Sequence, residues 1–330
     1  MLCLGIESTA HTFSCSVVEL RNGKGKIHSD VRSVYKPPEG AGIHPREASR
    51  HHAEQSPEVL KNALKNASVS INEIDAIAYS AGPGLGPCLR VGAVVARCLS
   101  GYYKKPLVPV NHAVGHLDLG MLLTGAKDPL VLLVSGGHSM ILALSNNRWR
   151  VFGETLDITI GQLLDQFGRE VGFASPCGAR IEELATRSSN YISLPYVVKG
   201  NDVSYSGLLT AAKKVAKSHK LEDVCYSIQE TAFAMLAEAT ERAVVFCNKK
   251  ELLVVGGVAA NRRLSNMLRD VCKRQGIKFF VAPINYAGDC GAQIAWTGLL
   301  EFKAGIKIDI EDAFVRQSWR LDTVDITWRN

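Results

Sequence analysis

The fold can be read from residues 2–20, LCLGIESTAHTFSCSVVEL. A short apolar run at 2–6 leads into small and polar residues, and a second run at 13–20 begins with alternating polarity. This stretch therefore predicts a strand, a tight loop and a returning strand. The same pattern recurs at 130–144, LVLLVSGGHSMILAL. Because one such hairpin opens each half of the chain, the pattern indicates a duplicated fold.

Helices and further strands alternate between and after the two hairpins. Pro45 suits the first position of a helix, and apolar residues at helical spacing mark a long helix at 222–248. We expect helices at 45–66, 88–103, from 112, 222–248, from 259 and at 288–303, and strands at 75–80, 107–110, 252–255 and 278–281. This alternation predicts an α/β fold with mixed sheets in two lobes and a ligand cleft between them.

The composition is that of an ordinary folded protein. The chain has 330 residues, of which 46% are hydrophobic and 21% charged, so it can bury a large core and is expected to form two domains. Its net charge of +6 tolerates a polyanionic partner without requiring one. The nine cysteines include no CxxC pair, which argues against a disulfide scaffold and a zinc ribbon. We expect a cytoplasmic protein with no signal peptide and no membrane segment.

Two histidines are candidate metal ligands. His112 and His116 lie four residues apart near the start of a predicted helix, so their rings share one face and can bind one transition metal ion. Histidines that only cap or pack have the same spacing, so the pair alone is a weak signal. Asp289, at the start of the last long helix, is the best candidate for a third ligand, although it is equally well placed to cap that helix.

Three loops of small residues each follow an apolar strand. Backbone N–H groups at such turns bind phosphate oxygens, and glycine lets a ligand approach the backbone closely. The loops contain Ser8 and Thr9, then Ser135, Gly136 and Gly137, and finally Gly256 and Gly257. One such loop would be ordinary turn chemistry, but three at strand ends favour a nucleotide cleft. Carboxylates near Gly178, at Asp165 and Glu182, could bind sugar hydroxyls or lie on helix surfaces.

Four motifs in this order resemble the TsaD family, whose archaeal and eukaryotic members are the catalytic subunits of the KEOPS complex. They are HAVGH at 112–116, VSGGH at 134–138, DVSYSGL at 202–208 and GGVAAN at 256–261. The similarity runs from Gly5 to about Lys303, which is nearly the whole chain. It implies an actin/Hsp70-like ATPase fold, with an N-terminal lobe at 1–127 that carries the metal-binding helix. The C-terminal lobe at 128–330 would carry the nucleotide loops, and its last long helix would return toward the N-terminal lobe.

The resemblance also implies a reaction and its cofactors. Family members transfer a threonylcarbamoyl group from threonylcarbamoyl-AMP to N6 of adenosine 37 in tRNAs that read codons beginning with A. Carried onto this chain, it makes His112, His116 and Asp289 ligands of one iron or zinc ion. The residues that would bind the adenine nucleotide are Leu133, Val134, Ser135, Gly136, Gly137, Asp165, Gly178, Glu182 and Asn261.

One position departs from the family pattern. Many archaeal relatives have a tyrosine just before the Val-Ser-Gly-Gly motif, where it can approach the metal, but this chain has Leu133. A leucine cannot ligate, so the metal would have three protein ligands, with water or substrate completing its shell. The expected partners are tRNA and the KEOPS subunits, namely a small dimerising subunit, an atypical kinase and a further small protein.

The residues alone leave three other functions open. A metalloprotease is disfavoured because no HExxH motif supplies a glutamate to activate a metal-bound water. A small-molecule kinase of the same fold class would carry a first loop of the Asp-x-Gly-Thr type, whereas this chain has Glu7-Ser8-Thr9 without the glycine. A nucleic-acid-binding module without enzymatic activity is the third alternative.

Overall fold

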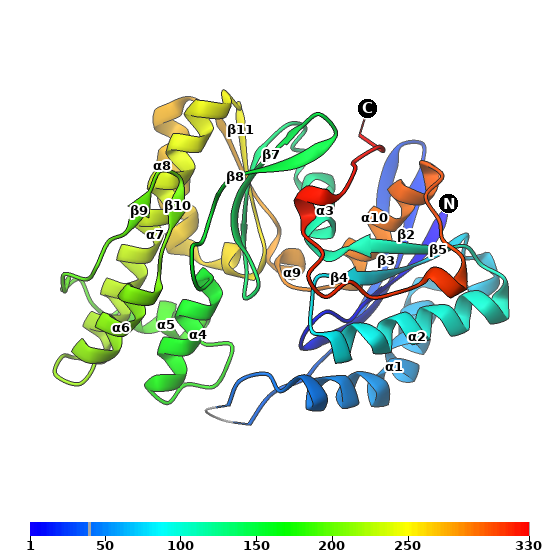
Figure 1. Ribbon diagram of the computed structural model, residues 1–330, viewed down its shortest axis with the longest axis horizontal. Coiled ribbons are helices and arrows are strands. Elements are labelled where there is room, and N and C mark those ends of the chain that lie inside the picture. Colours follow the sequence, from blue (N-terminus) through cyan, green and yellow to red (C-terminus); the bar gives the residue numbers. More distant parts are fainter. Residues whose placement is uncertain (39–40, 330) are drawn as a thin grey trace.

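Two five-stranded sheets with the same connectivity form the framework of the protein (Figure 1). The computed structural model describes residues 1–38 and 41–329. The first sheet has the order β3-β2-β1-β4-β5 and consists of β1 (Leu2–Glu7), β2 (Thr12–Arg21), β3 (Lys24–Val34), β4 (Ala76–Gly82) and β5 (Leu107–Asn111). The second has the order β12-β11-β6-β7-β8 and consists of β6 (Leu130–Val134), β7 (Ser139–Ser145), β8 (Arg148–Glu154), β11 (Glu251–Val255) and β12 (Lys278–Val281).

The duplication expected from the two hairpins is confirmed by the strand pairing. In the first sheet β1 runs antiparallel to β2 and parallel to β4. In the second, β6 runs antiparallel to β7 and parallel to β11. The third strand of each hairpin unit, β3 or β8, forms one edge of its sheet and was not predicted from the sequence. Both carry charged residues and are partly exposed, so they lack the apolar run that marks the central strands.

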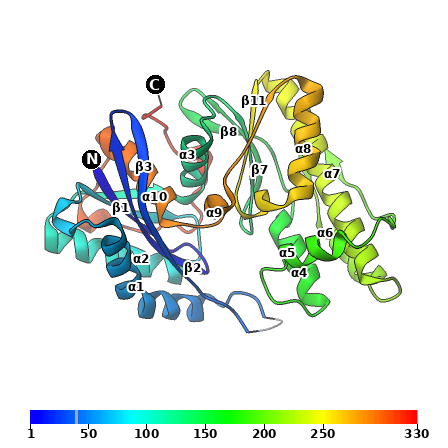
Figure 2. The same cartoon turned by 180° about the vertical axis from the view of Figure 1, so that it is seen from behind.

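The helices cover the sheets on both faces, as Figures 1 and 2 show. Around the first sheet lie α1 (Pro45–Ala67), α2 (Gly86–Tyr103), α3 (His112–Thr124) and α10 (Gly291–Lys303). Around the second lie α4 (Ile160–Glu170), α5 (Gly178–Ala185), α6 (Ser206–Val215), α7 (Leu221–Cys247) and α8 (Arg262–Gln275), with the short hairpin of β9 (Val198–Lys199) and β10 (Asp202–Val203) beside them. The last long helix, α10, packs on the first sheet.

Helix α3 lies between the two sheets. Its residue Leu119 belongs to the core of the first sheet, whereas Val114 and Leu117 pack with Leu253 and Val255 of β11. All but its last turn is buried, which explains why the segment is apolar all round rather than on one face. Any side chain that α3 carries is therefore held at the junction of the lobes.

Two predicted helix starts were wrong by a few residues. The helix expected from Ala259 is preceded by a 3₁₀ turn, η2 (Gly257–Ala260), because the Asn261 side chain accepts hydrogen bonds from the amides of Arg263 and Leu264 and so caps α8. The helix expected from 288 begins at Gly291, after the short helix α9 (Ile284–Ala287). Asp289 consequently lies in the loop between α9 and α10 and does not cap α10.

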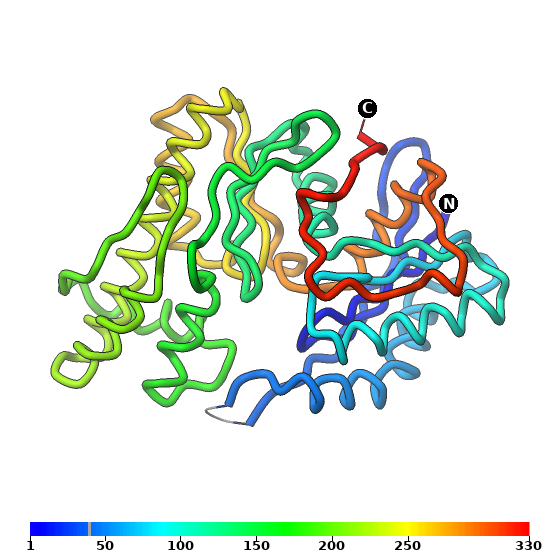
Figure 3. The backbone as a smooth tube through the Cα atoms, in the orientation of Figure 1, coloured from blue at the N-terminus to red at the C-terminus, as the bar shows by residue number. Residues whose placement is uncertain are grey.

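The C-terminal segment crosses from one lobe to the other. In Figure 3 the red trace runs along the first sheet, turns beside α3 and ends near the junction. The amide of Arg316 donates to the carbonyl of Ala81, and the amide of Ile326 donates to the carbonyl of Asn147 in the second sheet's β7–β8 turn. Across residues 1–38 and 41–329, the helices lack the combination of length and apolar character that a membrane crossing requires.

Candidate active site

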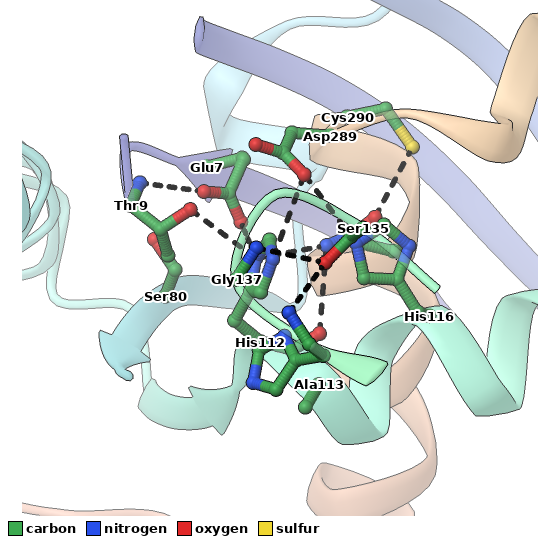
Figure 4. Close-up of polar contacts among 12 residues, drawn as sticks. Glu7, Thr9, Ser80, His112, Ala113, His116, Ser135, Gly137, Asp289 and Cys290 are labelled. Carbon is green, nitrogen blue, oxygen red and sulfur yellow. Dashed lines mark hydrogen bonds and ion pairs between the residues drawn. The ribbon is translucent and has the colours of Figure 1, made fainter. Parts of the chain in front are cut away.

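The structure brings together the three residues proposed as metal ligands (Figure 4). His112 and His116 come from α3, and Asp289 comes from the loop before α10. The Oδ1 atom of Asp289 lies 3.5 Å from Nε2 of His112 and 3.4 Å from Nε2 of His116. One ligand atom of each residue lies within 4.8 Å of the other two, which is the separation that a single ion bridges.

Two further residues hold His112 in place. Its Nδ1 atom lies 2.9 Å from a carboxylate oxygen of Glu7 and 3.0 Å from the side-chain amide of Gln293. A carboxylate only accepts hydrogen bonds, so the Glu7 contact places the proton on Nδ1 and leaves Nε2 free to ligate. Histidine ligands in metal sites are commonly oriented by a carboxylate in this way.

The burial of His116 tests whether a metal ion fits the site. Its Nε2 atom is buried and has no hydrogen-bond partner among the described residues. A buried polar atom without a partner costs about 1–3 kcal/mol. An ion bound by His112, His116 and Asp289 would remove this cost, so the arrangement fits a divalent transition metal with two imidazoles and one carboxylate as ligands.

The electrostatics of the cluster favour positive charge. Burial lowers the pKa of His112, but the charges of Glu7 and Asp289 more than offset it and raise that pKa to about 9. At His116 burial prevails and lowers the pKa. Burial raises the pKa of Asp289, but the two imidazoles hold it well below its usual range. A cation bound between these groups would take the place of the protons that the carboxylates otherwise attract.

The loop of Ser8 and Thr9 supports this cluster. Both residues are buried, and Thr9 Oγ1 lies 3.4 Å from Nδ1 of His112. The amide of Ser8 donates to Ser80 Oγ at 3.0 Å, and the amide of Thr9 donates to Glu7 at 2.6 Å. These two N–H groups are already used inside the protein, so the loop contributes to the surroundings of His112.

The glycine loops of the second sheet lie against each other. Ser135 Oγ accepts hydrogen bonds from the amides of Gly137 and His138 at 3.2 and 3.0 Å, which shapes the tip after β6. Gly256 has φ +94°, and a Cβ atom there would lie 2.3 Å from the carbonyl oxygen of Val134. Only glycine permits this approach of the β11 loop to β6. The next amide, that of Gly257, is at the start of η2 and has no acceptor within that turn.

The other proposed nucleotide-binding residues join the surrounding helices. Asp165 of α4 accepts from the amide of Cys177 at 2.7 Å, next to Gly178 at the start of α5. Glu182 of α5 accepts from the amide of Arg262 at 2.8 Å, next to Asn261 at the start of α8. The side chains of Leu133 and Val134 are fully buried, so these two residues can offer a ligand only their backbone.

Several residues around the cluster of His112, His116 and Asp289 were not predicted from the sequence. Glu7 and Gln293 contact His112, and the ring of His138 stacks over His112. Asn111 caps α3 by accepting from the amides of Ala113 and Val114, and its side chain donates to the carbonyl of Trp319. The cap could have been recognised from Asn111 preceding the helix. The other contacts join segments that are distant in sequence and leave no local signal.

Two hollows on the described surface are lined by residues outside this site. One, of about 710 Å³, lies along β3 and α9 and includes Asp30, Arg32 and Tyr286. The other, of about 240 Å³, includes Tyr191, Tyr196 and Tyr226.

Solved structures share the fold of this chain. The structure of HypF from T. kodakarensis aligns with a TM-score of 0.64 at 14% identity, over 92% of this chain and 48% of that one. The activator of the 2-hydroxyisocaproyl-CoA dehydratase from Clostridium difficile, solved with ADPNP bound, aligns with a TM-score of 0.55 at 13% identity, over 92% of this chain and 97% of that one. These likenesses confirm the expected two-lobed ATPase-type fold.

Much stronger matches come from sequence. Proteins named tRNA N6-adenosine threonylcarbamoyltransferase are 49% identical in Caldivirga maquilingensis, over 99% of this chain and 98% of the relative, and 50% identical in Thermococcus sibiricus, over 99% and 100%. The protein of the same name from Sulfurisphaera tokodaii is 50% identical over 100% of this chain and 99% of its own. The model of the TsaD family, described as tRNA N6-adenosine threonylcarbamoyltransferase, matches residues 26–296. On the strength of these sequence matches, the chain belongs to the TsaD family.

Proposed function

We propose that this protein transfers a threonylcarbamoyl group from threonylcarbamoyl-AMP to N6 of adenosine 37 in tRNAs that read codons beginning with A. Full-length relatives at about 50% identity carry the name of this activity. The observation that carries the mechanism is the convergence of His112, His116 and Asp289 at the junction of the lobes, next to the glycine loops.

The reaction would depend on one iron or zinc ion held by His112, His116 and Asp289. When bound, such an ion supplies a Lewis acid for the carbonyl of the group that is transferred. The protein supplies the rest of the arrangement. Glu7 orients the ring of His112, and Leu133 is buried in the core beside α3, so three protein ligands leave room for the substrate.

The adenylate would bind in the second lobe. The N–H groups of Gly136 and Gly257 are suited to its phosphate, and Asp165, Glu182 and Asn261 to its ribose and base. The amides of Ser8, Thr9, Ser135 and Gly137 donate within the protein, so we assign the phosphate to the amides of Gly136 and Gly257. Since Ser135–Gly137 follows the strand that packs against α3, a ligand bound there can direct its acyl end toward His112.

The acceptor is the exocyclic amine of adenosine. Its lone pair is delocalised into the ring, so the rate would depend strongly on holding amine and carbonyl together. The adenylate phosphate is a good leaving group, and the carbon–nitrogen bond forms as the carbon–oxygen bond of the mixed anhydride breaks. The net charge of +6 is compatible with tRNA as the acceptor.

We further propose a cytoplasmic protein that works with the KEOPS subunits, a small dimerising subunit, an atypical kinase and a further small protein. Helices α1 and α2 are the proposed docking surface. On α2, the side chains of Val94 and Tyr102 are 55% and 80% exposed.

Reconstitution tests the function. The protein is combined with tRNA, threonine, bicarbonate, ATP and a threonylcarbamoyl-AMP synthase, with and without partner subunits, and the nucleosides of the tRNA are analysed. We expect modified adenosine in the wild-type reactions. The His112→Ala variant should lose both the bound metal and the transfer activity. The His219→Ala variant, changed at an exposed site in the second lobe, should keep both. Full transfer by metal-free His112→Ala protein would refute the Lewis-acid role, and no modification by any wild-type mixture would refute the activity.

A further inference from the structure

His138 lies close to the cluster of His112, His116 and Asp289 but belongs to the second lobe. It lies in the turn between β6 and β7, whereas His112 and His116 come from α3, between the two sheets, and Asp289 comes from the loop before α10, which packs on the first sheet. Its ring is nearly parallel to that of His112, with an interplanar angle of 26° and 6.5 Å between the ring centroids.

The turn holds His138 rigidly. Its carbonyl accepts from the amide of Ser135 at 2.8 Å, and its amide donates to Ser135 Oγ at 3.0 Å. The tip is anchored in turn by Thr159, whose hydroxyl donates to the carbonyl of Gly136 at 2.9 Å. A side chain on such a braced turn is preorganised to meet a ligand.

The imidazole itself is uncommitted. Every hydrogen bond of His138 among the described residues is made by its main chain. A neutral imidazole offers one N–H donor and one nitrogen acceptor. His112, in contrast, has its Nδ1 atom committed to Glu7.

We propose that His138 contacts the acyl end of the donor and selects threonylcarbamoyl-AMP over AMP, by hydrogen bonding to an oxygen of the threonylcarbamoyl group. This inference rests on the proposed function. In the proposed complex the donor has its phosphate at the Ser135–Gly137 tip and its carbonyl at the cluster of His112, His116 and Asp289. Between these two points it passes His138, which directly follows the tip. The threonylcarbamoyl group carries carbonyl, hydroxyl and carboxylate oxygens, and AMP lacks this group.

The test compares two probes on purified, metal-loaded protein by calorimetry: a non-hydrolysable threonylcarbamoyl-adenylate analogue and AMP. His138→Phe keeps a ring of similar shape but removes both nitrogens. His138→Gln restores a donor and an acceptor. The matched control is His219→Phe, because His219 is exposed and bonds only to Ser218 and the carbonyl of Val215. The metal content of each protein is measured by mass spectrometry.

We expect His138→Phe to bind the analogue about tenfold more weakly, which corresponds to ~1.4 kcal/mol. Its metal content and its affinity for AMP should equal those of the wild type. His138→Gln should keep more of the preference for the analogue, and the His219→Phe control should keep all of it.

Three results would overturn the proposal. The first is a His138→Phe protein that prefers the analogue as strongly as the wild type does. The second is a His138→Phe protein that loses its metal, which would show that His138 helps to hold the ion. A loss in the Gln variant as large as in the Phe variant would show that a donor and an acceptor at this position do not restore the preference, so hydrogen bonding does not set it. A wild-type protein that does not prefer the analogue would instead refute the proposed function, and this inference with it.

Discussion

The carboxylate of Glu7 lies 2.9 Å from Nδ1 of His112, although 105 residues separate them in the chain. Glu7 ends the central strand of the first sheet, and His112 begins the helix at the junction of the lobes. Glu7 is fully buried, and its other oxygen accepts from the amide of Thr9. The first hairpin is thus connected directly to the candidate metal centre.

Replacing Glu7 by glutamine should weaken metal binding without removing a ligand. The amide cannot accept the proton of His112 as strongly as the carboxylate does, so the ring is held less firmly. We expect metal affinity to fall about 10- to 100-fold, measured by competition with a chromophoric chelator. The control is Glu19→Gln, since Glu19 pairs with His28 at the surface of the first sheet. Unchanged affinity in Glu7→Gln protein would show that the contact does not orient His112 for a metal.

Gly256→Ala should destabilise the loop after β11, and Gly257→Ala should not. At Gly256 the φ of +94° and the carbonyl of Val134 both oppose a Cβ atom, whereas a Cβ atom at Gly257 meets open space. We expect Gly256→Ala to lower the free energy of unfolding by about 2 kcal/mol or more and to weaken AMP binding, as seen by urea denaturation and calorimetry. Similar behaviour of the two variants would mean that the close approach of the loops is not needed.

Trp328→Phe should loosen the C-terminal segment from α3. The indole Nε1 donates to Oδ2 of Asp118 at 3.0 Å, and Asp118 is buried. Phenylalanine keeps most of the apolar contact but leaves the carboxyl group of Asp118 with one hydrogen-bond donor fewer. A loss of about 1–3 kcal/mol in unfolding free energy is expected, and limited proteolysis should cut the segment sooner. Trp319→Phe is the comparison, because Trp319 contacts Asn111 through its main-chain carbonyl. Equal losses of stability in Trp328→Phe and Trp319→Phe would show that the hydrogen bond of the Trp328 indole to Asp118 does not hold the segment.

Asp157 should make stability depend on pH through the loop before α6. Its carboxylate accepts from the hydroxyls of Ser204 and Ser206 at 2.6 Å and from the amide of Tyr205 at 2.8 Å. Although burial raises the pKa of Asp157, these hydrogen bonds lower it below its ordinary value of 3.8. The folded state therefore binds the proton less readily than the unfolded state, so the stabilisation is present above about pH 4 and is lost as the pH falls.

The expected result for Asp157→Ala is a lower melting temperature than the wild type at pH 7, by an amount that corresponds to roughly 1–2 kcal/mol. The difference should shrink as the pH is brought below about 4, because the unfolded wild-type chain then binds a proton at Asp157 that the folded protein binds less readily. Thermal melts at pH 7, 5 and 3 measure it. A difference that stays constant over this range would exclude a contribution from the charge.

Local sequence patterns determined much of the architecture. The apolar runs at 2–6 and 130–134 become the central strands of the two sheets, and the helical spacing at 222–248 becomes α7. These elements were predictable because the period of apolar residues reports directly which face of a strand or helix is buried. The histidine spacing of α3 belongs to the same kind of information, since residues four apart on a helix must share a face.

Only the tertiary structure decided which distant residues meet. That Asp289 faces His116, that Glu7 holds His112 and that His138 stacks over His112 all depend on α3 being packed between two separately formed sheets. The edge strands β3 and β8 were missed for a related reason. They are stabilised by pairing with a neighbour and not by a continuous apolar face of their own. Periodicity along the chain carries no distance between elements, and those distances are set by the packing of side chains across the junction of the lobes.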